Sequence, residues 1–427
     1  MFAKSLAPWL ASHRIHYGWA MVALTFATTI CCSAAISLPG VLILPLAKEF
    51  GWGRGDISGA IALMFVLFGG VAPFAGALMQ RCGLRRVVTV AVMLTMAALF
   101  GVTRTTEKWH LWLSIGVLLG IASGTTGMAL SAMIASRWFT QRRGLVMGIL
   151  AAAFATGQLT FLPAAAWLAT TYGWRAAVLP AAIGCAICAF LFPLLAADWP
   201  SEVGLAPFGG TWVQPQSRAA SGNVIGMSVA VLREGMSTGW FWLLIGTFFV
   251  CGASSTGIVQ QHFIPFCADN GLLPVRAASY LALMGMFNFA GTILSGFLSD
   301  RFDNRKLLAW YYGLRGLSLI WLPFSGFDVV SLSIFAVFFG LDFIATVPPT
   351  VSLAAHNFGT AKAPIIFGWA FASHQFGAAA SALGAGLTRD LLTTYVPAFL
   401  VAGLICLLAA VALLVVRPVR LVPVAAE

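Results

Sequence analysis

A few ionisable residues interrupt the long apolar segments of this sequence, and their spacing could support proton or ion chemistry. Asp342 lies near the middle of the apolar run 329–355, and Pro348 and Pro349 begin six residues later. A charge at the centre of a bilayer costs about 2.5–3.5 kcal/mol or more, so such a residue usually faces a cavity or a partner. Each proline removes a backbone donor and favours a kink. The pattern predicts a buried carboxylate beside a bent helix, which is a candidate proton or substrate site.

Two basic side chains are expected at the depth of Asp342. Counted from a short loop near residues 326–327, Arg315 and Asp342 both lie roughly 18–22 Å from the membrane surface at 1.5 Å per residue. Asp342 and His374 flank the next loop, near residues 359–360, and their depths agree to within roughly 6 Å. These spacings predict a constellation on three helices. In it, Asp342 carries an exchangeable proton, and His374 relays the proton or binds substrate because imidazole titrates near neutral pH.

The sequence leaves two roles open for Arg315. It either holds Asp342 ionised or offers a positive charge to a carboxylate substrate. The alternative is a purely structural ion pair between Arg315 and Asp342, with His374 as a packed, hydrogen-bonded histidine. Further polar candidates for substrate binding are His262, Gln261, Asn288, Gln375 and Gln158. His262 is expected either to line the outer end of the path or to lie at the membrane interface.

The composition identifies the class of protein that must position these residues. Of the 427 residues, 60% are hydrophobic and 9% are charged, which is far from a soluble domain. Apolar runs over the whole length predict an all-α, polytopic membrane protein. The formal net charge of +11 is attributed to basic loops at helix ends rather than to a nucleic-acid partner. The first apolar segment lacks a cleavage pattern and is expected to remain as a helix.

The eight cysteines of the chain point to neither a metal site nor a cofactor. Cys185 and Cys188 form a CxxC inside an apolar helix, without a histidine or a charge nearby. Core packing is therefore favoured over metal or redox chemistry.

The apolar runs predict twelve transmembrane helices. They are expected at residues 17–47, 57–79, 87–102, 111–136, 145–171, 176–197, 240–267, 277–298, 307–323, 329–355, 363–387 and 396–416. The polar stretch 198–238 is interpreted as a linker between a first bundle at residues 15–197 and a second at residues 239–417. The end of this linker, residues 227–236, predicts a short amphipathic helix on the membrane surface. Because Lys and Arg gather in alternate loops, both termini are placed in the cytoplasm and the chain in the inner (plasma) membrane.

Two loops of the sequence have similar residue patterns. Residues 76–86 read GALMQRCGLRR, and residues 296–306 read GFLSDRFDNRK, 220 positions further on. These segments follow the second and the eighth predicted helices, which argues for two six-helix repeats in parallel orientation. The predicted fold is two six-helix bundles related by a pseudo-twofold axis.

This pair of loops resembles the G-x-L-x-D-R-x-G-R-[RK] motif of the major facilitator superfamily, and the resemblance covers nearly the whole chain. It implies a cytoplasmic gate in which glycines let helices approach while acidic and basic residues form a breakable clasp. The gate positions are Gly76, Gln80, Arg81, Gly83, Arg85, Arg86, Gly296, Asp300, Arg301 and Arg305. In the first copy Gln80 replaces the usual Asp, and because its amide is uncharged a weaker gate is expected there. In the second copy Asp303 replaces the usual Gly. The alternative is that these residues only set the topology.

Within that superfamily, several stretches resemble the bacterial monocarboxylate-porter-like group, which includes oxalate/formate antiporter-like proteins. They are HYGW at 16–19, EFGW at 49–52, RWFTQRRGL at 137–145, GWRAA at 173–177 and WPSEVGL at 199–205. Animal monocarboxylate transporters carry an Asp and an Arg in helix 8 and a Lys in helix 1. The corresponding helix 8 positions here are Asn288 and Thr292, and the first apolar span has no Lys. The proton and lactate machinery of those relatives therefore cannot be transferred to this chain.

These features predict a secondary active transporter and not an enzyme. The chain has no P-loop, and its apolar helices contain no HExxH or GxSxG motif. The leading hypothesis is symport of a small organic anion, a carboxylate, with a proton, by alternating access and as a monomer in the lipid bilayer. One alternative is proton-coupled export of a larger apolar or cationic compound, and another is a membrane sensor that does not transport.

Overall fold

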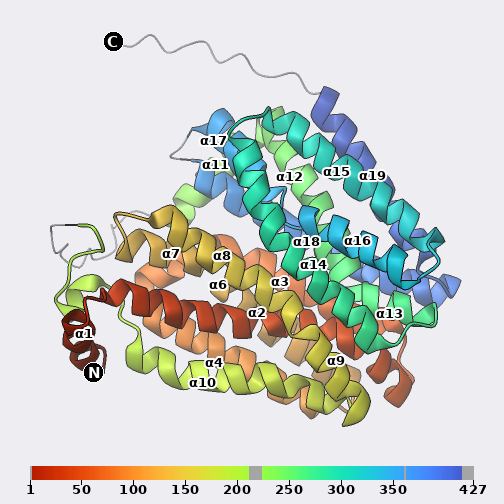
Figure 1. Ribbon diagram of the computed structural model, residues 1–427, viewed down its shortest axis with the longest axis horizontal. Helices are drawn as coiled ribbons and strands as arrows, with labels where there is room; N and C mark the ends of the chain where they lie inside the picture. The colour runs from red at the N-terminus through yellow and green to blue at the C-terminus, as the bar shows by residue number, and fades with distance from the viewer. Residues whose placement is uncertain (1, 211–223, 360–361, 416–427) are drawn as a thin grey trace.

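The computed structural model describes residues 2–210, 224–359 and 362–415 (Figure 1). The centre of the predicted linker, residues 211–223, and the predicted end of the second bundle at residues 416–417 lie outside the described residues. Within the described ranges, ten helices are long and apolar enough to cross a membrane. The two remaining predicted spans are also helical, so each of the twelve expected membrane helices is found.

The first half of the chain contains six membrane helices, and three of them consist of more than one segment. They are α2 (Tyr17–Phe50), α3 (Arg54–Cys82), α4 (Leu84–Thr103), the run of α5 (Lys108–Leu111), η1 (Trp112–Leu119), α6 (Gly120–Thr126) and α7 (Met128–Trp138), the pair α8 (Arg143–Thr160) and α9 (Leu162–Thr171), and the pair η2 (Trp174–Val178) and α10 (Leu179–Leu195). A short helix that the sequence analysis did not predict, α1 (Phe2–Ser12), precedes them and packs on α10.

The second half follows the polar stretch and has the same number of membrane helices. Its elements are η3 (Pro200–Val203), α11 (Val224–Met236), the run of α12 (Gly239–Gly252), η4 (Ala253–Gln260) and α13 (Gln261–Asp269), α14 (Pro274–Ser299), α15 (Asn304–Trp321) with η5 (Leu322–Phe324), α16 (Val329–Asp342), α17 (Val347–Phe358), α18 (Ala363–Leu392) and α19 (Val396–Val415). Helix α11 contains the segment predicted as amphipathic, and it packs beside α18, α12 and α3.

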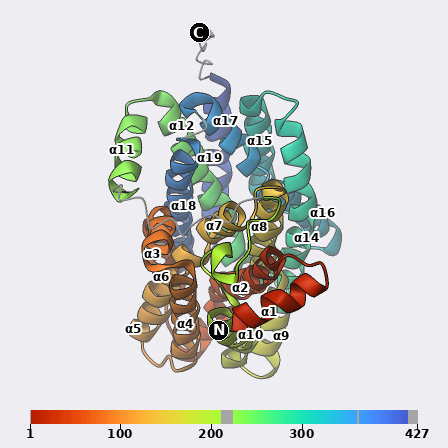
Figure 2. The same cartoon turned by 90° about the vertical axis from the view of Figure 1, so that its left-hand side faces the viewer.

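Helices of each half pack mainly with one another, and the two bundles lie side by side (Figure 1). Contacts between them involve α3 with α18, α2 with α13, and α14 with both α8 and α9. The loops form two faces, because each helix reverses the direction of the one before it. We call the face that carries α1 and the motif loops the N-terminal face (Figure 2), and the other the opposite face.

Helices α15 and α18 are the two predicted spans that are less apolar than the rest. Helix α15 carries Arg305, Lys306 and Arg315 within 18 residues. Helix α18 is rich in alanine and glycine, and these small side chains let α12 and α3 approach it closely. At Gly377, for example, an added Cβ would lie 2.0 Å from the Phe249 carbonyl oxygen of α12.

Two membrane helices are interrupted at corresponding positions of the two halves. The helix of α6 and α7 breaks at Gly127, and the helix of α16 and α17 breaks over residues 343–346. The loop repeat is spaced by 220 residues, and this spacing carries Gly127 onto position 347. Position 347 is the residue directly after the second break, so the two interruptions lie at nearly equivalent positions of the repeat. The second break follows Asp342 directly, and Pro348 and Pro349 lie in the first turn of the next helix, where a missing N–H is tolerated.

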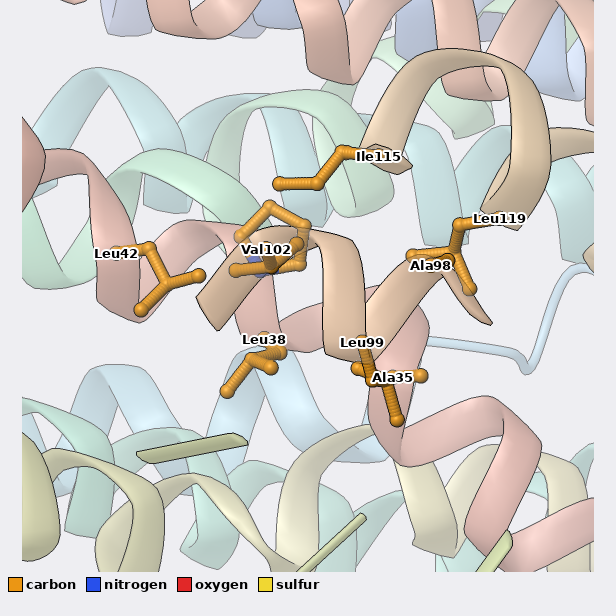
Figure 3. A pocket seen from close by; sticks show the side chains of 9 residues that line it. Ala35, Leu38, Leu42, Ala98, Leu99, Val102, Ile115 and Leu119 are labelled. Carbon is orange, nitrogen blue, oxygen red and sulfur yellow. The ribbon is translucent and has the colours of Figure 1, made fainter. Parts of the chain in front are cut away.

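The small cavity shown in Figure 3 is not a binding site. It lies in the first half between α2, α4 and η1, has a volume of about 10 Å³, and is lined by apolar side chains including Leu38, Leu42 and Leu119. This is at most the room needed for one water molecule, and the walls offer it no polar partner. The cavity is therefore a packing defect.

Candidate functional site

Arg315 and Asp342, which the sequence places at one depth, form a direct ion pair. Arg315 lies on α15 and is fully buried, and Asp342 is the last residue of α16 and is 6% exposed. Arg315 Nε donates a hydrogen bond of 2.5 Å to Asp342 Oδ2. The other carboxylate oxygen, Oδ1, is buried and makes no hydrogen bond within the described residues. The pair thus has one unused acceptor, to which a proton could add.

The Arg315 guanidinium also binds the backbone of the interrupted helix. Its Nη2 donates to the carbonyl oxygen of Asp342 at 2.6 Å and to that of Phe343 at 3.3 Å. Carbonyls freed by a break inside a membrane need replacement partners, because no water reaches them. Arg315 therefore supports the break as well as the charge of Asp342.

Two side chains of α14 pair further backbone groups of the break. Asn288 Oδ1 accepts a hydrogen bond of 3.0 Å from the backbone N–H of Ile344. The Ser295 hydroxyl donates to the Ala345 carbonyl oxygen at 2.5 Å. The amide oxygen of Asn288 thus stabilises the interruption, and the expected role of this residue in substrate binding remains a prediction. The sequence analysis missed Ser295.

The remaining side of Arg315 faces the helix formed by α12 and η4. Its Nη1 donates to Cys251 Sγ at 3.1 Å and to Ser254 Oγ at 3.4 Å. The rings of Tyr312 and Phe339 lie 5.7 Å and 5.8 Å from the guanidinium carbon, within cation–π range. Arg315 is thus surrounded by partners from three helices.

His374 lies near this pair, and within the described residues no hydrogen bond or ion pair joins it to Asp342. It is a half-buried residue of α18, its ring stacks on Phe371 with centroids 5.8 Å apart, and Phe248 packs against it at 5.5 Å. Cys251 lies close both to His374 and to Arg315. The Nδ1 atom of His374 is buried and makes no hydrogen bond within the described residues. The three predicted residues are therefore grouped, with Cys251 between the histidine and the ion pair.

The other polar candidates lie at contacts between helices. His262 is fully buried, with Nε2 2.9 Å from the Ala382 carbonyl oxygen and Nδ1 3.4 Å from the Tyr395 hydroxyl, so it lines no vestibule in this conformation. Gln261 Nε2 donates to the Ile36 carbonyl oxygen of α2 at 3.3 Å.

Gln375 and Gln158 are also buried, on α18 and α8. Gln375 packs where α18 meets α3, with its Cβ 3.0 Å from the place that a Cβ on Gly69 would occupy. Its Oε1 has no hydrogen-bond partner within the described residues. These two glutamines remain predictions as substrate-binding residues.

The first motif loop is held by a carboxylate that the sequence analysis did not single out. Asp198 Oδ1 accepts a hydrogen bond of 2.7 Å from the Arg85 backbone N–H at the start of α4. Gly83 has a φ of +88°, and a Cβ added to it would lie 2.7 Å from Asp198 Oδ2, so only glycine fits there. Arg137 donates to the Asp198 carbonyl oxygen at 3.2 Å. Burial raises the pKa of the neighbouring Glu202.

The second motif loop is organised differently. Asp303 Oδ1 accepts from the Arg305 backbone N–H at 2.9 Å and caps α15, and the Arg301 guanidinium carbon lies 3.9 Å from the centre of the Phe297 ring. Within the described residues, no neighbouring element comes within 4 Å of a Cβ added to Gly76 or Gly296, so helices do not approach closely at these two glycines in this conformation.

Comparison with known proteins gives consistent matches. Residues 24–382 match the family model of the Major Facilitator Superfamily. Monocarboxylate transporter 13 of Rattus norvegicus is 26% identical over 394 residues, which cover 91% of this chain and 86% of that protein. The Uncharacterized MFS-type transporter YcxA of Bacillus subtilis (strain 168) is 26% identical over 394 residues, covering 88% and 90% of the two chains. The crystal structure of D-xylose-proton symporter has a TM-score of 0.70 at 15% identity, covering 94% of this chain and 98% of that one.

The structural likeness confirms the predicted fold of two helical bundles, and the family model spans most of both halves. The resemblance noted in the two motif loops thus extends over the chain. The chain belongs to the Major Facilitator Superfamily, and it is a multi-pass membrane transporter and not an enzyme.

Proposed function

We propose that this transporter carries a small organic anion, a carboxylate, across the plasma (inner) membrane together with a proton by alternating access. Support for the cargo comes from the relatives named monocarboxylate transporters, which match over most of the chain. Support for the coupling comes from one observation: Asp342 is a buried carboxylate with one oxygen paired to Arg315 and the other unpaired. An anion entering against an inside-negative potential needs a cotransported positive charge.

The geometry provides a way for the proton to favour binding of the anion. While Asp342 is ionised, it compensates the charge of Arg315, and the pair is neutral as a whole. A proton on Asp342 Oδ1 cancels the carboxylate charge and leaves the guanidinium uncompensated in a low-dielectric region. The local positive charge then attracts a carboxylate substrate. In this proposal His374, with its free Nδ1, passes the proton towards the pair or binds the substrate, and Cys251 lies between them.

We place both termini and the N-terminal face in the cytoplasm, with the protein acting as a monomer. The support is the concentration of Lys and Arg in the loops of that face. In this orientation the ion pair of Arg54 in the first half with Asp269 in the second half lies at the external face.

The test is uptake by the purified full-length chain reconstituted in proteoliposomes. We expect an inward proton gradient to drive accumulation of radiolabelled monocarboxylates such as pyruvate or lactate. In the variant Asp342→Asn, the gradient-driven accumulation is expected to fall at least about tenfold, because Asn cannot take up the proton. Exchange of labelled for unlabelled substrate at equal pH should persist.

A matched control is Asp328→Asn, which changes the carboxylate at the other end of the same helix. Asp328 is exposed, its pKa is held low by hydrogen bonds from Ser331, and it caps α16. Its replacement should leave gradient-driven uptake within about twofold of the parent, because an Asn can still cap a helix. Full gradient-driven accumulation by Asp342→Asn would disprove the coupling role.

A further inference from the structure

The chain that leaves the first bundle folds back onto the turn between α7 and α8. We call residues 205–210 the strap. Phe208 donates its backbone N–H to the Trp138 carbonyl oxygen at 2.8 Å. The Phe208 carbonyl oxygen accepts from the backbone N–H groups of Thr140, at 3.0 Å, and Gln141, at 3.2 Å. The Thr140 hydroxyl donates to the same oxygen at 2.9 Å. These bonds join the backbone of the strap to the turn.

The ring of Phe208 packs among aromatic side chains from two other segments. Its centroid lies 5.7 Å from that of Phe139 in the turn, and 5.6 Å and 6.0 Å from those of His16 and Trp19 at the start of α2. The Arg142 guanidinium carbon lies 5.7 Å from the centre of the Phe208 ring, within cation–π range. Phe208 is therefore held both by its ring and by its backbone.

His16 connects the strap to the start of α2 and uses both ring nitrogens to do so. Its Nε2 lies 2.9 Å from the Ala206 carbonyl oxygen of the strap. Its Nδ1 accepts a hydrogen bond of 3.1 Å from the Gly18 backbone N–H and caps α2. A carbonyl oxygen only accepts, so Nε2 carries a hydrogen, and Nδ1, which accepts, carries none. The docked strap therefore requires the neutral form of the His16 ring.

The charged side chains around this contact are basic. Arg14 lies two residues before His16, Arg142 contacts the Phe208 ring, and Arg143 Nε donates to the Phe139 carbonyl oxygen at 2.5 Å. The strap, LAPFGG, has no titratable side chain. Within the described residues no acidic side chain forms an ion pair with His16. A proton on His16 would thus place a further positive charge here, at the positive end of the α2 dipole.

We propose that His16 is a pH-sensitive switch that holds the strap while its imidazole is neutral and releases the strap when the imidazole takes up a proton. A hydrogen on Nδ1 would point at the Gly18 N–H, so the ring must turn away from the cap. Because the imidazole is rigid, the same turn carries Nε2 away from Ala206. Residues 211–223 join the strap to α11, so the switch acts on the connection between the two halves.

Hydrogen exchange of the purified full-length protein measures whether the strap is docked. The informative backbone amides are those of Thr140, Gln141 and Phe208, which are bonded in the docked strap. Histidine is the side chain that ordinarily changes charge near neutral pH, so rates are compared at about pH 7.5 and about pH 5.5 and corrected for intrinsic exchange. We expect the protection of these amides to fall about tenfold at the lower pH, as for the loss of a helix cap.

Two variants at position 16 separate the charge of the histidine from its capping role. His16→Asn should make the protection insensitive to pH, because asparagine remains a good N-cap and does not titrate in this range. His16→Lys should lower the protection at both pH values, because lysine stays charged and offers no acceptor.

His13 provides the matched control, because it is an exposed histidine three residues earlier whose Nδ1 lies 2.9 Å from the Trp9 carbonyl oxygen of its own helix. His13→Asn should keep the pH response of the parent to within about twofold, because it leaves the contacts of His16 in place. An equal loss of the response in His13→Asn would contradict the assignment to His16.

The proposal is overturned if the protection in the parent does not change with pH, or if His16→Asn responds to pH as the parent does. Phe208→Ala should lower the protection at both pH values, and unchanged protection in this variant would show that the strap is not held as described. Thermal unfolding in detergent verifies that each variant is folded. The readout involves no cargo and no proton gradient, so its outcome is independent of the proposed function.

Discussion

The guanidinium of Arg315 binds both the carboxylate of Asp342 and two backbone carbonyls, and only the contact with the carboxylate could be predicted from the sequence. Its ion pair with Asp342 follows from depth, because the rise per residue of a helix is fixed and both residues are counted from one short loop. Its bonds to the carbonyls of Asp342 and Phe343 could not be foreseen, because they exist only where the helix opens. The sequence also could not predict that Cys251 lies between His374 and the ion pair, because this depends on how the side chains of different helices pack.

Replacing Arg315 by Lys tests the hydrogen bonds that Arg315 donates to the carbonyls of Asp342 and Phe343. Lysine keeps the charge but lacks the planar fork, so Arg315→Lys should lose the hydrogen bonds to the carbonyls of Asp342 and Phe343. We expect it to destabilise the protein by about 1.5–3 kcal/mol, the range for hydrogen bonds to charged groups. Asp342→Asn should cost more, because it leaves the buried guanidinium of Arg315 without its counter-charge. Thermal unfolding in detergent compares them, and equal stability of Arg315→Lys and the parent would contradict the carbonyl contacts.

The interrupted helix of α16 and α17 shows what proline does in a membrane span. A helical N–H binds the carbonyl four residues earlier, so Pro348 and Pro349 leave the carbonyls of Ile344 and Ala345 without their usual partners. The defect therefore falls about one turn before the prolines, directly after Asp342, where the structure has it. Which neighbours pair the freed groups depends on the packing of α14 and α15, which the sequence does not reveal.

Removing the amide of Asn288 tests how the interruption is supported. Asn288→Leu should leave the Ile344 N–H unpaired inside the membrane and cost about 1–3 kcal/mol of stability. Thr292→Val is the control, because the hydrogen bonds of the Thr292 hydroxyl in the described part of the chain go to the carbonyl and side-chain oxygens of Asn288. Its loss should change stability by less than about 0.5 kcal/mol. Similar unfolding midpoints for Asn288→Leu and Thr292→Val would argue against this role.

The two-bundle architecture follows from sequence because it depends on signals that repeat along the chain. Long apolar runs mark the spans, and the motif loops mark the repeat. The contacts that Arg54 makes with Asp269 and Asp390 of the second half could not be predicted, because the three residues are distant in sequence and each looks like an ordinary charge at a helix end. The same is true of Asp198, whose contact with the start of α4 depends on how the first bundle packs.

The proposed orientation can be tested with a cysteine that the chain already has. Cys82 ends α3 at the N-terminal face and is exposed, whereas the other cysteines are buried or half-buried. We expect a membrane-impermeant maleimide to leave Cys82 unmodified in intact cells and to modify it in inside-out vesicles. The variant Cys82→Ser should remove the signal. Modification of Cys82 in intact cells would place the N-terminal face outside.

The paired interruptions of the two halves differ in how widely a disturbance at each would spread. Around Gly127, the hydroxyls of Thr125 and Thr126 turn back to the Ala122 carbonyl of their own helix. Around residues 343–346, by contrast, backbone groups that lack helical partners form hydrogen bonds with side chains of α14 and α15. A change of backbone conformation at the first interruption can therefore stay within its own helix. A change at the second interruption must also break hydrogen bonds to α14 and α15, so it displaces two neighbouring helices as well.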